Sequence, residues 1–155
     1  EPVCSFVGAR TSVGDFSDRP PRVLEADERL ETGSHTFRIL DTKHVPHGWD
    51  ASLMFEESAS TLFCSDLLGQ GGDVEALYSG DIVGRSDEYN SRQSQGPMSG
   101  AVPFTKETRP ILNSLADLNP KTLACMHGSS FEGDCGQALR DFGEVLERLS
   151  GRHGG

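Results

Sequence analysis

The sequence predicts an α+β fold, with strands in its first half and its clearest helix at the end. Residues 36–40 alternate apolar and polar side chains with a period of two, which is typical of a half-buried strand. Residues 134–151 instead carry apolar side chains at helical spacing along one stripe. The chain has 155 residues, the length of one ordinary domain. We therefore expect a single domain in which a sheet packs against helices.

The first elements are predicted to be a lead-in, a strand and a hairpin. Residues 1–22 are rich in turn formers and end near two adjacent prolines, so we expect an extended lead-in there. The strand at 36–40 follows. Residues 51–56 and 60–65 are two further strands, and the short turn between them predicts a hairpin.

A Gly/Ser-rich loop region at 69–100 separates this hairpin from the later elements. It contains seven glycines and five serines, and short helical pieces at 73–78 and 86–92 would break up an uncommonly long loop. Residues 105–118 have helical spacing and residues 121–126 predict a short strand. The last helix follows. Its apolar stripe consists of Ala138, Leu139, Phe142, Val145, Leu146 and Leu149.

Composition excludes several classes of partner. Lys and Arg number 14 against 24 Asp and Glu, giving a net charge of −10, which repels phosphate backbones and anionic lipids. We therefore expect no nucleic acid and no membrane partner. No apolar run approaches the roughly 20 residues that cross a bilayer, so we expect a soluble protein. The four cysteines lack close pairing in sequence, which favours reduced thiols and a cytoplasmic location.

Three polar residues lie at or just after the ends of predicted strands. Asp66 follows the strand that ends at residue 65, His127 follows the strand at 121–126, and His47 lies in the loop after the strand at 36–40. Side chains at strand ends project beyond the edge of a sheet, where groups distant in sequence can meet. We therefore predict that His47, Asp66 and His127 converge at one edge of the sheet.

The surroundings of these three residues resemble the later metal-ligand motifs of the metallo-β-lactamase fold. The segments are HVPHGWD at 44–50, TLFCSDLL at 61–68 and LACMHGSS at 123–130. The spacing is 18 residues between the first histidine ligand and the aspartate, and 60 between the aspartate and the second histidine, which is similar to the flavodiiron and oxygen-binding di-iron branch. The resemblance implies the C-terminal half of an αββα sandwich.

The resemblance also implies roles for individual residues. His47 and His127 would each bind one metal, and Asp66 would bridge the pair through its two carboxylate oxygens. Asp50, three residues after His47, would accept a hydrogen bond from an imidazole N–H and fix its tautomer. His44 is a rival ligand that fits the pattern less well. No catalytic residue is implied beyond the metal ligands.

The sequence departs from the family pattern at two places. The earlier ligand motif is absent, because neither His35 nor His44 is followed by an acid at the required offset. Ser65 stands where relatives often have Gly before the bridging aspartate. We therefore expect an incomplete domain that begins in mid-fold. Its missing half would leave an apolar face around Ile39, Met54 and Phe63, so self-association is expected.

Three functions remain open from the sequence. The first is a non-haem di-iron site that binds or reduces dioxygen, with electrons from a donor protein because no flavin domain is attached. The second is a zinc-dependent hydrolase of esters, amides or phosphodiesters, acting on a small-molecule substrate. The third is a truncated, catalytically silent fragment, because three ligands cannot hold two metals as tightly as a full set.

Overall fold

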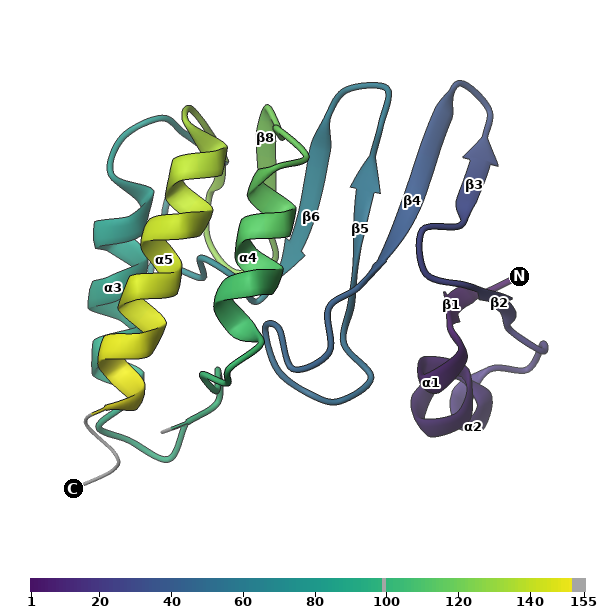
Figure 1. The fold of residues 1–155 in the computed structure, drawn as a ribbon, viewed down its shortest axis with the longest axis horizontal. Helices are drawn as coiled ribbons and strands as arrows, with labels where there is room; N and C mark the ends of the chain where they lie inside the picture. Colours follow the sequence, from purple (N-terminus) through teal and green to yellow (C-terminus); the bar gives the residue numbers. More distant parts are fainter. Residues whose placement is uncertain (99, 152–155) are drawn as a thin grey trace.

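The computed structural model describes residues 1–98 and 100–151 and has an α+β architecture, as predicted (Figure 1). Its main sheet has seven strands in the order β3-β4-β5-β6-β8-β9-β7. These strands are β3 (Arg29–Thr32), β4 (His35–Asp41), β5 (Ser52–Glu56), β6 (Thr61–Ser65), β7 (Leu77–Tyr78), β8 (Thr122–Cys125) and β9 (Ser130–Glu132).

The direction of pairing changes in the middle of the sheet. Strands β3 to β6 form antiparallel pairs, and the predicted hairpin is β5 and β6. Strand β6 then pairs with β8 in parallel, with Leu62 opposite Leu123. A parallel pair needs a long crossover connection, and here the chain between the two strands contains two helices. The carboxyl ends of β6 and β8 therefore lie at the same edge.

Three helices lie side by side over one end of the sheet, while β3, β4 and β5 extend beyond them (Figure 1). Helix α5 (Cys135–Ser150) packs against both α3 (Ile82–Gln93) and α4 (Thr108–Ala116). The α5 stripe predicted from the sequence is buried in the core, and the Asp134 side chain caps the helix by accepting from the Gln137 N–H at 2.9 Å. None of the described helices has the length and apolarity of a membrane span.

The N-terminal segment differs from the expected extended lead-in. It contains β1 (Val3–Ser5), α1 (Phe6–Gly8), a π-helical segment (Ala9–Val13), α2 (Gly14–Phe16) and β2 (Arg22–Leu24). The prolines constrain only their own neighbourhood, and the Ser5 hydroxyl caps the first turn by accepting from the Gly8 N–H at 3.1 Å. Strands β1 and β2 pair in parallel as a separate two-stranded sheet.

The 69–100 region has more regular structure than its composition suggests. Helix α3 extends the predicted piece at 86–92 in both directions, beginning after the Asp81 cap. The predicted helical piece at 73–78 is absent, and its last two residues form β7, which pairs in parallel with β9. Pairing with a distant strand therefore overrides local propensity here. Ser99 lies outside the described residues.

The sheet face opposite the main core is partly covered. Ile39 is only 5% exposed, because the N-terminal segment lies against it and Leu24 is buried beside it. Phe63 remains 44% exposed, and Phe37 lies next to it with ring centroids 6.2 Å apart. The apolar face expected from the sequence is thus narrower than predicted and centred on Phe63.

This remaining face generates a prediction about assembly. We expect the purified chain to self-associate in light-scattering measurements, because burying Phe63 and its neighbours removes apolar surface from water. Phe63→Ser should shift the chain toward monomer, whereas Val23→Ser, on a separate exposed strand, should not. A wild-type chain that is a uniform monomer at high concentration would contradict this expectation.

A buried carboxylate holds the turn between β5 and β6. Glu56 is 4% exposed and accepts hydrogen bonds from the Ser58 N–H at 3.0 Å and the Ala59 N–H at 2.6 Å. The His35 Nδ1 atom lies 3.1 Å from Oε1 of Glu56, the oxygen that also accepts from the Ser58 N–H. Burial raises the pKa of Glu56, but these hydrogen bonds to its charged form outweigh burial and lower the pKa to about 2.

This shift predicts an acid-dependent contribution to stability. The pKa of Glu56 in the folded chain is below the ordinary 4.5, so its carboxylate stabilises the fold above that pH, and this contribution is lost as pH falls toward 2. Glu56→Gln should therefore lower the free energy of unfolding at pH 7, and the difference from wild type should shrink between pH 4.5 and pH 2. Denaturant titrations at several pH values test this. Glu31→Gln, at an exposed position, should show no such trend; a difference independent of pH would contradict the assignment.

Candidate metal centre

The carboxyl ends of β6 and β8 position two of the predicted ligands. Asp66 follows β6 directly, and His127 comes two residues after β8. The parallel register shifts between Phe63 and Ser65, where the chain forms a β-bulge opposite Cys125. The Met126 N–H donates to the Ser65 carbonyl at 3.0 Å, which joins the two strands at their last residues. A bulge re-aims the side chains that follow it, and Asp66 is the first of these.

Ser65 has a strained backbone conformation at this bulge. This residue has a φ of 51°, in the left-handed region that glycine adopts without strain. A side chain there costs roughly 1 kcal/mol. Ser65 therefore retains a backbone conformation that glycine would adopt at lower cost.

His47 is placed by a compact loop between β4 and β5. The buried Thr42 hydroxyl donates to the Val45 carbonyl at 2.8 Å, and the Val45 side chain is 1% exposed. The His44 N–H donates to the Gly48 carbonyl at 2.7 Å across the turn. The loop is therefore anchored at its base, and His47 extends from its tip.

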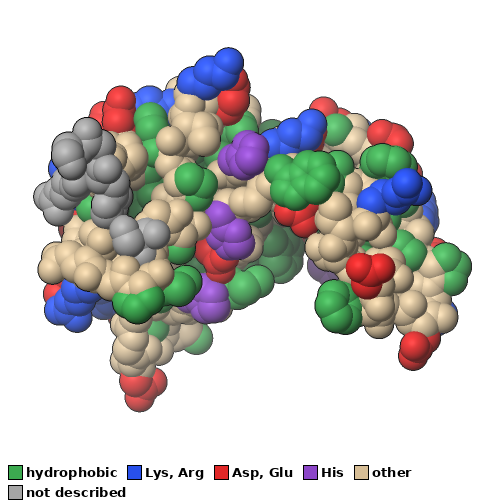
Figure 2. Space-filling model, turned by 90° about the horizontal axis from the view of Figure 1, so that it is seen from below, with side chains coloured by type: hydrophobic (Ala, Val, Ile, Leu, Met, Phe, Trp, Pro, Cys, Tyr) green, Lys and Arg blue, Asp and Glu red, His purple; other side chains and the backbone are tan. Residues whose placement is uncertain are grey.

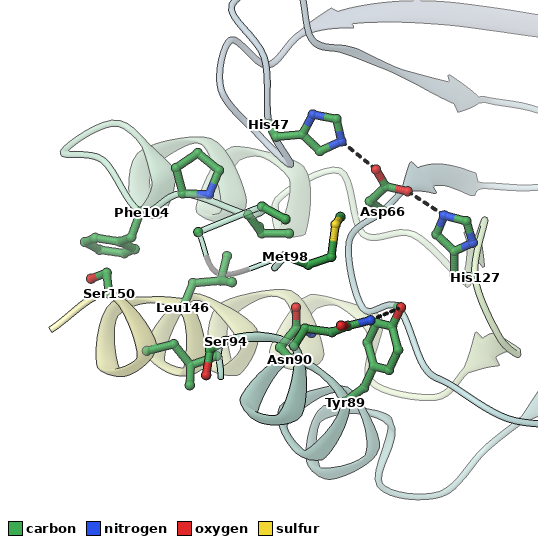
Figure 3. Close-up of a pocket in the computed structure, with 17 residues that line it drawn as sticks. His47, Asp66, Tyr89, Asn90, Ser94, Met98, Phe104, His127, Leu146 and Ser150 are labelled. Atoms are coloured by element: carbon green, nitrogen blue, oxygen red, sulfur yellow. Dashed lines mark hydrogen bonds and ion pairs between the residues drawn. The ribbon is translucent and has the colours of Figure 1, made fainter. Parts of the chain in front are cut away.

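The three predicted residues meet at this edge. Asp66 lies between the two imidazoles, with Oδ2 2.6 Å from His47 Nε2 and Oδ1 3.0 Å from His127 Nε2 (Figure 3). The Asp66 side chain is 26% exposed, and both imidazoles are more than half exposed. Figure 2 shows this face, with histidine and acidic side chains gathered in the middle of the molecule. The predicted convergence is confirmed.

The three side chains are of types that bind metal ions in proteins. Each carboxylate oxygen faces a different imidazole, so each ion would receive one nitrogen and one oxygen from these residues. Imidazole and carboxylate ligands are those that iron and zinc accept in proteins. Within the described part of the chain, however, no three His, Cys, Asp or Glu side chains are arranged to hold one ion. The described residues therefore bring together metal-binding side chains without completing the coordination of an ion.

The other candidate residues lie elsewhere. The Asp50 carboxylate does not take the predicted place beside an imidazole: it accepts from the Ser12 hydroxyl at 3.4 Å and the Thr11 hydroxyl at 3.5 Å. Gly48, with a φ of 81°, turns the chain between His47 and Asp50, and the N-terminal segment supplies the partners instead. His44 is exposed, and His35 contacts Glu56 on a distant part of the sheet.

Sequence reasoning missed Gln70, which links the two ligand-bearing loops. Its side chain is 5% exposed and accepts from the Ser129 N–H at 3.0 Å, and its own N–H donates to the His127 carbonyl at 2.8 Å. Its amide N–H₂ donates to the carbonyls of Leu68 at 2.7 Å and Ser129 at 3.3 Å. A single polar residue in a glycine-rich loop carries no periodic signal, so only its position four residues after Asp66 hinted at a role.

A cavity of about 620 Å³ opens beside the three residues. His47, Asp66 and His127 line one part of it, and helices α3 and α5 with the segment 100–104 line the rest (Figure 3). The Tyr89 hydroxyl accepts from the Gln93 amide at 3.0 Å along the α3 wall. The candidate centre therefore adjoins a cavity large enough for an organic molecule.

Comparison with solved structures shows the fold. Rubredoxin oxygen:oxidoreductase from Desulfovibrio gigas matches 92% of the chain with a TM-score of 0.67 and 20% identity. The flavodiiron protein from Giardia intestinalis matches 96% with a TM-score of 0.70 and 17% identity. The chemotaxis sensor ODP from T. denticola matches 96% with a TM-score of 0.61 and 15% identity. No family model and no curated sequence matches the chain.

These similarities establish the fold of the flavodiiron proteins, which is the metallo-β-lactamase fold. The chain spans 37% and 35% of the first two proteins and 58% of the sensor. The predicted fold class is therefore confirmed, and this chain is much shorter than the proteins that share its fold.

The Gln70 link predicts a specific loss of stability. Gln70→Leu removes the partners of the Ser129 N–H and of two carbonyls in the interior, which should cost about 1–3 kcal/mol in the free energy of unfolding. Gln95→Leu, at an exposed position, should change it by less than about 0.5 kcal/mol. Urea titrations of both variants test this. Equal small effects would show that the link does not hold the loops.

Proposed function

We propose that His47, Asp66 and His127 form part of a non-haem di-iron centre that binds or reduces dioxygen. The observation that carries this is the position of Asp66, which offers one carboxylate oxygen toward each of two imidazoles. A carboxylate in that position can bridge two ions while each histidine binds one. Iron held in this way would supply the redox chemistry of dioxygen.

The matched structures favour iron and dioxygen over zinc and hydrolysis. One is named as an oxygen:oxidoreductase that acts with rubredoxin, another as a flavodiiron protein, and the sensor was also solved as a peroxy di-iron species. By analogy, electrons would come from a donor protein or from protein outside these 155 residues. Hydrolysis by a zinc pair remains the competing proposal, and the metal preference of the site distinguishes the two.

The chain's own residues have defined tasks in this proposal. The two imidazoles supply neutral nitrogen donors, and Asp66 supplies the negative charge that offsets two cations. The exposed histidines leave room for further ligands and for a small substrate. With two donors for each ion, these residues alone would bind iron weakly, so tight retention would require donors from another polypeptide or another part of the protein.

Iron binding tests the proposal. Anaerobic equilibrium dialysis against Fe(II), followed by elemental analysis, should show up to two irons per chain at saturation. His127→Ala and Asp66→Asn should each weaken binding by about tenfold or more, because each removes a donor. His44→Ala is the matched control and should bind as wild type does, since His44 lies outside the cluster.

Two outcomes would contradict the assignment. Equal losses in His44→Ala and His127→Ala would mean that iron binds nonspecifically to histidine. Wild-type binding no stronger than that of Asp66→Asn would remove the bridging role. Competition with Zn(II) in the same dialysis distinguishes the two functions. The hydrolase would be favoured if zinc displaced iron at every ratio of the two metals and if the iron-loaded chain consumed no dioxygen in air.

A further inference from the structure

The cavity beside the histidines is much larger than a diatomic substrate requires. Its volume is about 620 Å³, roughly twenty times the 30 Å³ that one water occupies in the liquid. It lies in the range of about 300–1,000 Å³ typical of pockets for organic ligands. Dioxygen alone would leave most of this space unfilled.

Most of the cavity wall is apolar. Leu146 and Leu149 of α5 line the cavity, and so do Val102 and Phe104 of the segment between α3 and α4. Figure 3 shows Leu146 and Phe104 in the wall. Tyr89 of α3 adds an aromatic ring close to the cluster. The polar cluster lies at one end, so the cavity has a polar end and an apolar body.

The charges along this wall select against anions. Among the described residues that line the cavity, Asp66 is the single acidic one and none is Lys or Arg. In the metal-free chain, an anionic ligand would therefore lose its hydration without gaining an ion pair from these described residues, and the net charge of −10 adds repulsion. An uncharged ligand avoids both costs and gains from contact with the leucine and phenylalanine side chains.

We infer that this cavity binds an uncharged, largely apolar organic molecule, with its hydrogen-bonding group toward Asp66 and the histidines. This ligand is distinct from dioxygen, and its binding does not depend on the proposed metal. Asn90 and Gln93 of α3 offer additional amide groups near the polar end.

A matched pair of fluorescent probes tests the inference on the metal-free chain. N-phenyl-1-naphthylamine is uncharged, and 8-anilinonaphthalene-1-sulfonate has the same rings with an added sulfonate. We expect fluorescence titrations in the presence of chelator at pH 8 to show saturable one-to-one binding of the uncharged probe. The sulfonate should bind at least about tenfold more weakly. Equal affinities, or tighter binding of the sulfonate, would overturn the charge argument.

Variants locate the binding site. Val102→Asp places a second carboxylate in the cavity and should weaken binding of the uncharged probe by about tenfold. Val23→Asp makes the same change on an exposed strand and should leave the affinity for the probe unaltered. Ala101→Trp fills part of the cavity and should have the same effect without changing the charge. Far-ultraviolet circular dichroism and thermal unfolding confirm that each variant is folded.

The remaining control separates the cavity from the exposed sheet face. Phe63→Ser should not change probe affinity if the cavity is the site. Loss of binding in Phe63→Ser with unchanged binding in Val102→Asp and Ala101→Trp would overturn the inference. Because no metal is present in these titrations, their failure leaves the iron measurements unaffected, and failure of iron binding leaves the probe result intact.

Discussion

The buried amide of Gln70 is the contact on which the candidate centre depends. It joins the loop after β6 to the loop after β8, and these loops carry Asp66 and His127. Gly128 allows this approach: its φ is 103°, and a Cβ there would lie 2.8 Å from the Gln70 Cβ. A buried amide with all its partners fixes geometry more strictly than apolar contacts do, because any displacement leaves a polar group unpaired.

The contacts within the cluster contribute little to the stability of the fold. Both histidines are more than half exposed, and ion pairs in such positions are worth about 0–1 kcal/mol. Asp66 and His127 are therefore held by their strands and Gln70, and His47 by its own loop, more than by contacts among the three side chains. Three ligand-type side chains brought together at little gain in stability are consistent with a binding role, which is the basis of the proposed function.

The surroundings divide the centre into two environments. On the solvent side, both imidazoles are more than half exposed, which leaves them open to the further donors that the proposed metal centre would need. On the other side, α5 and the 100–104 segment line a largely apolar cavity that is partly open to solvent. The three side chains thus lie between an accessible polar edge and an apolar wall.

The sequence by itself determined the strands with two-residue periodicity, the stripe of the last helix and the three ligand-type residues at strand ends. These features are local, because the pattern of apolar side chains within one segment indicates which face is buried. Only the tertiary structure decided the partner of Asp50, the clamp made by Gln70, the strand at 77–78 and the cavity. Each of these depends on the register between segments 38 or more residues apart, which no local pattern specifies.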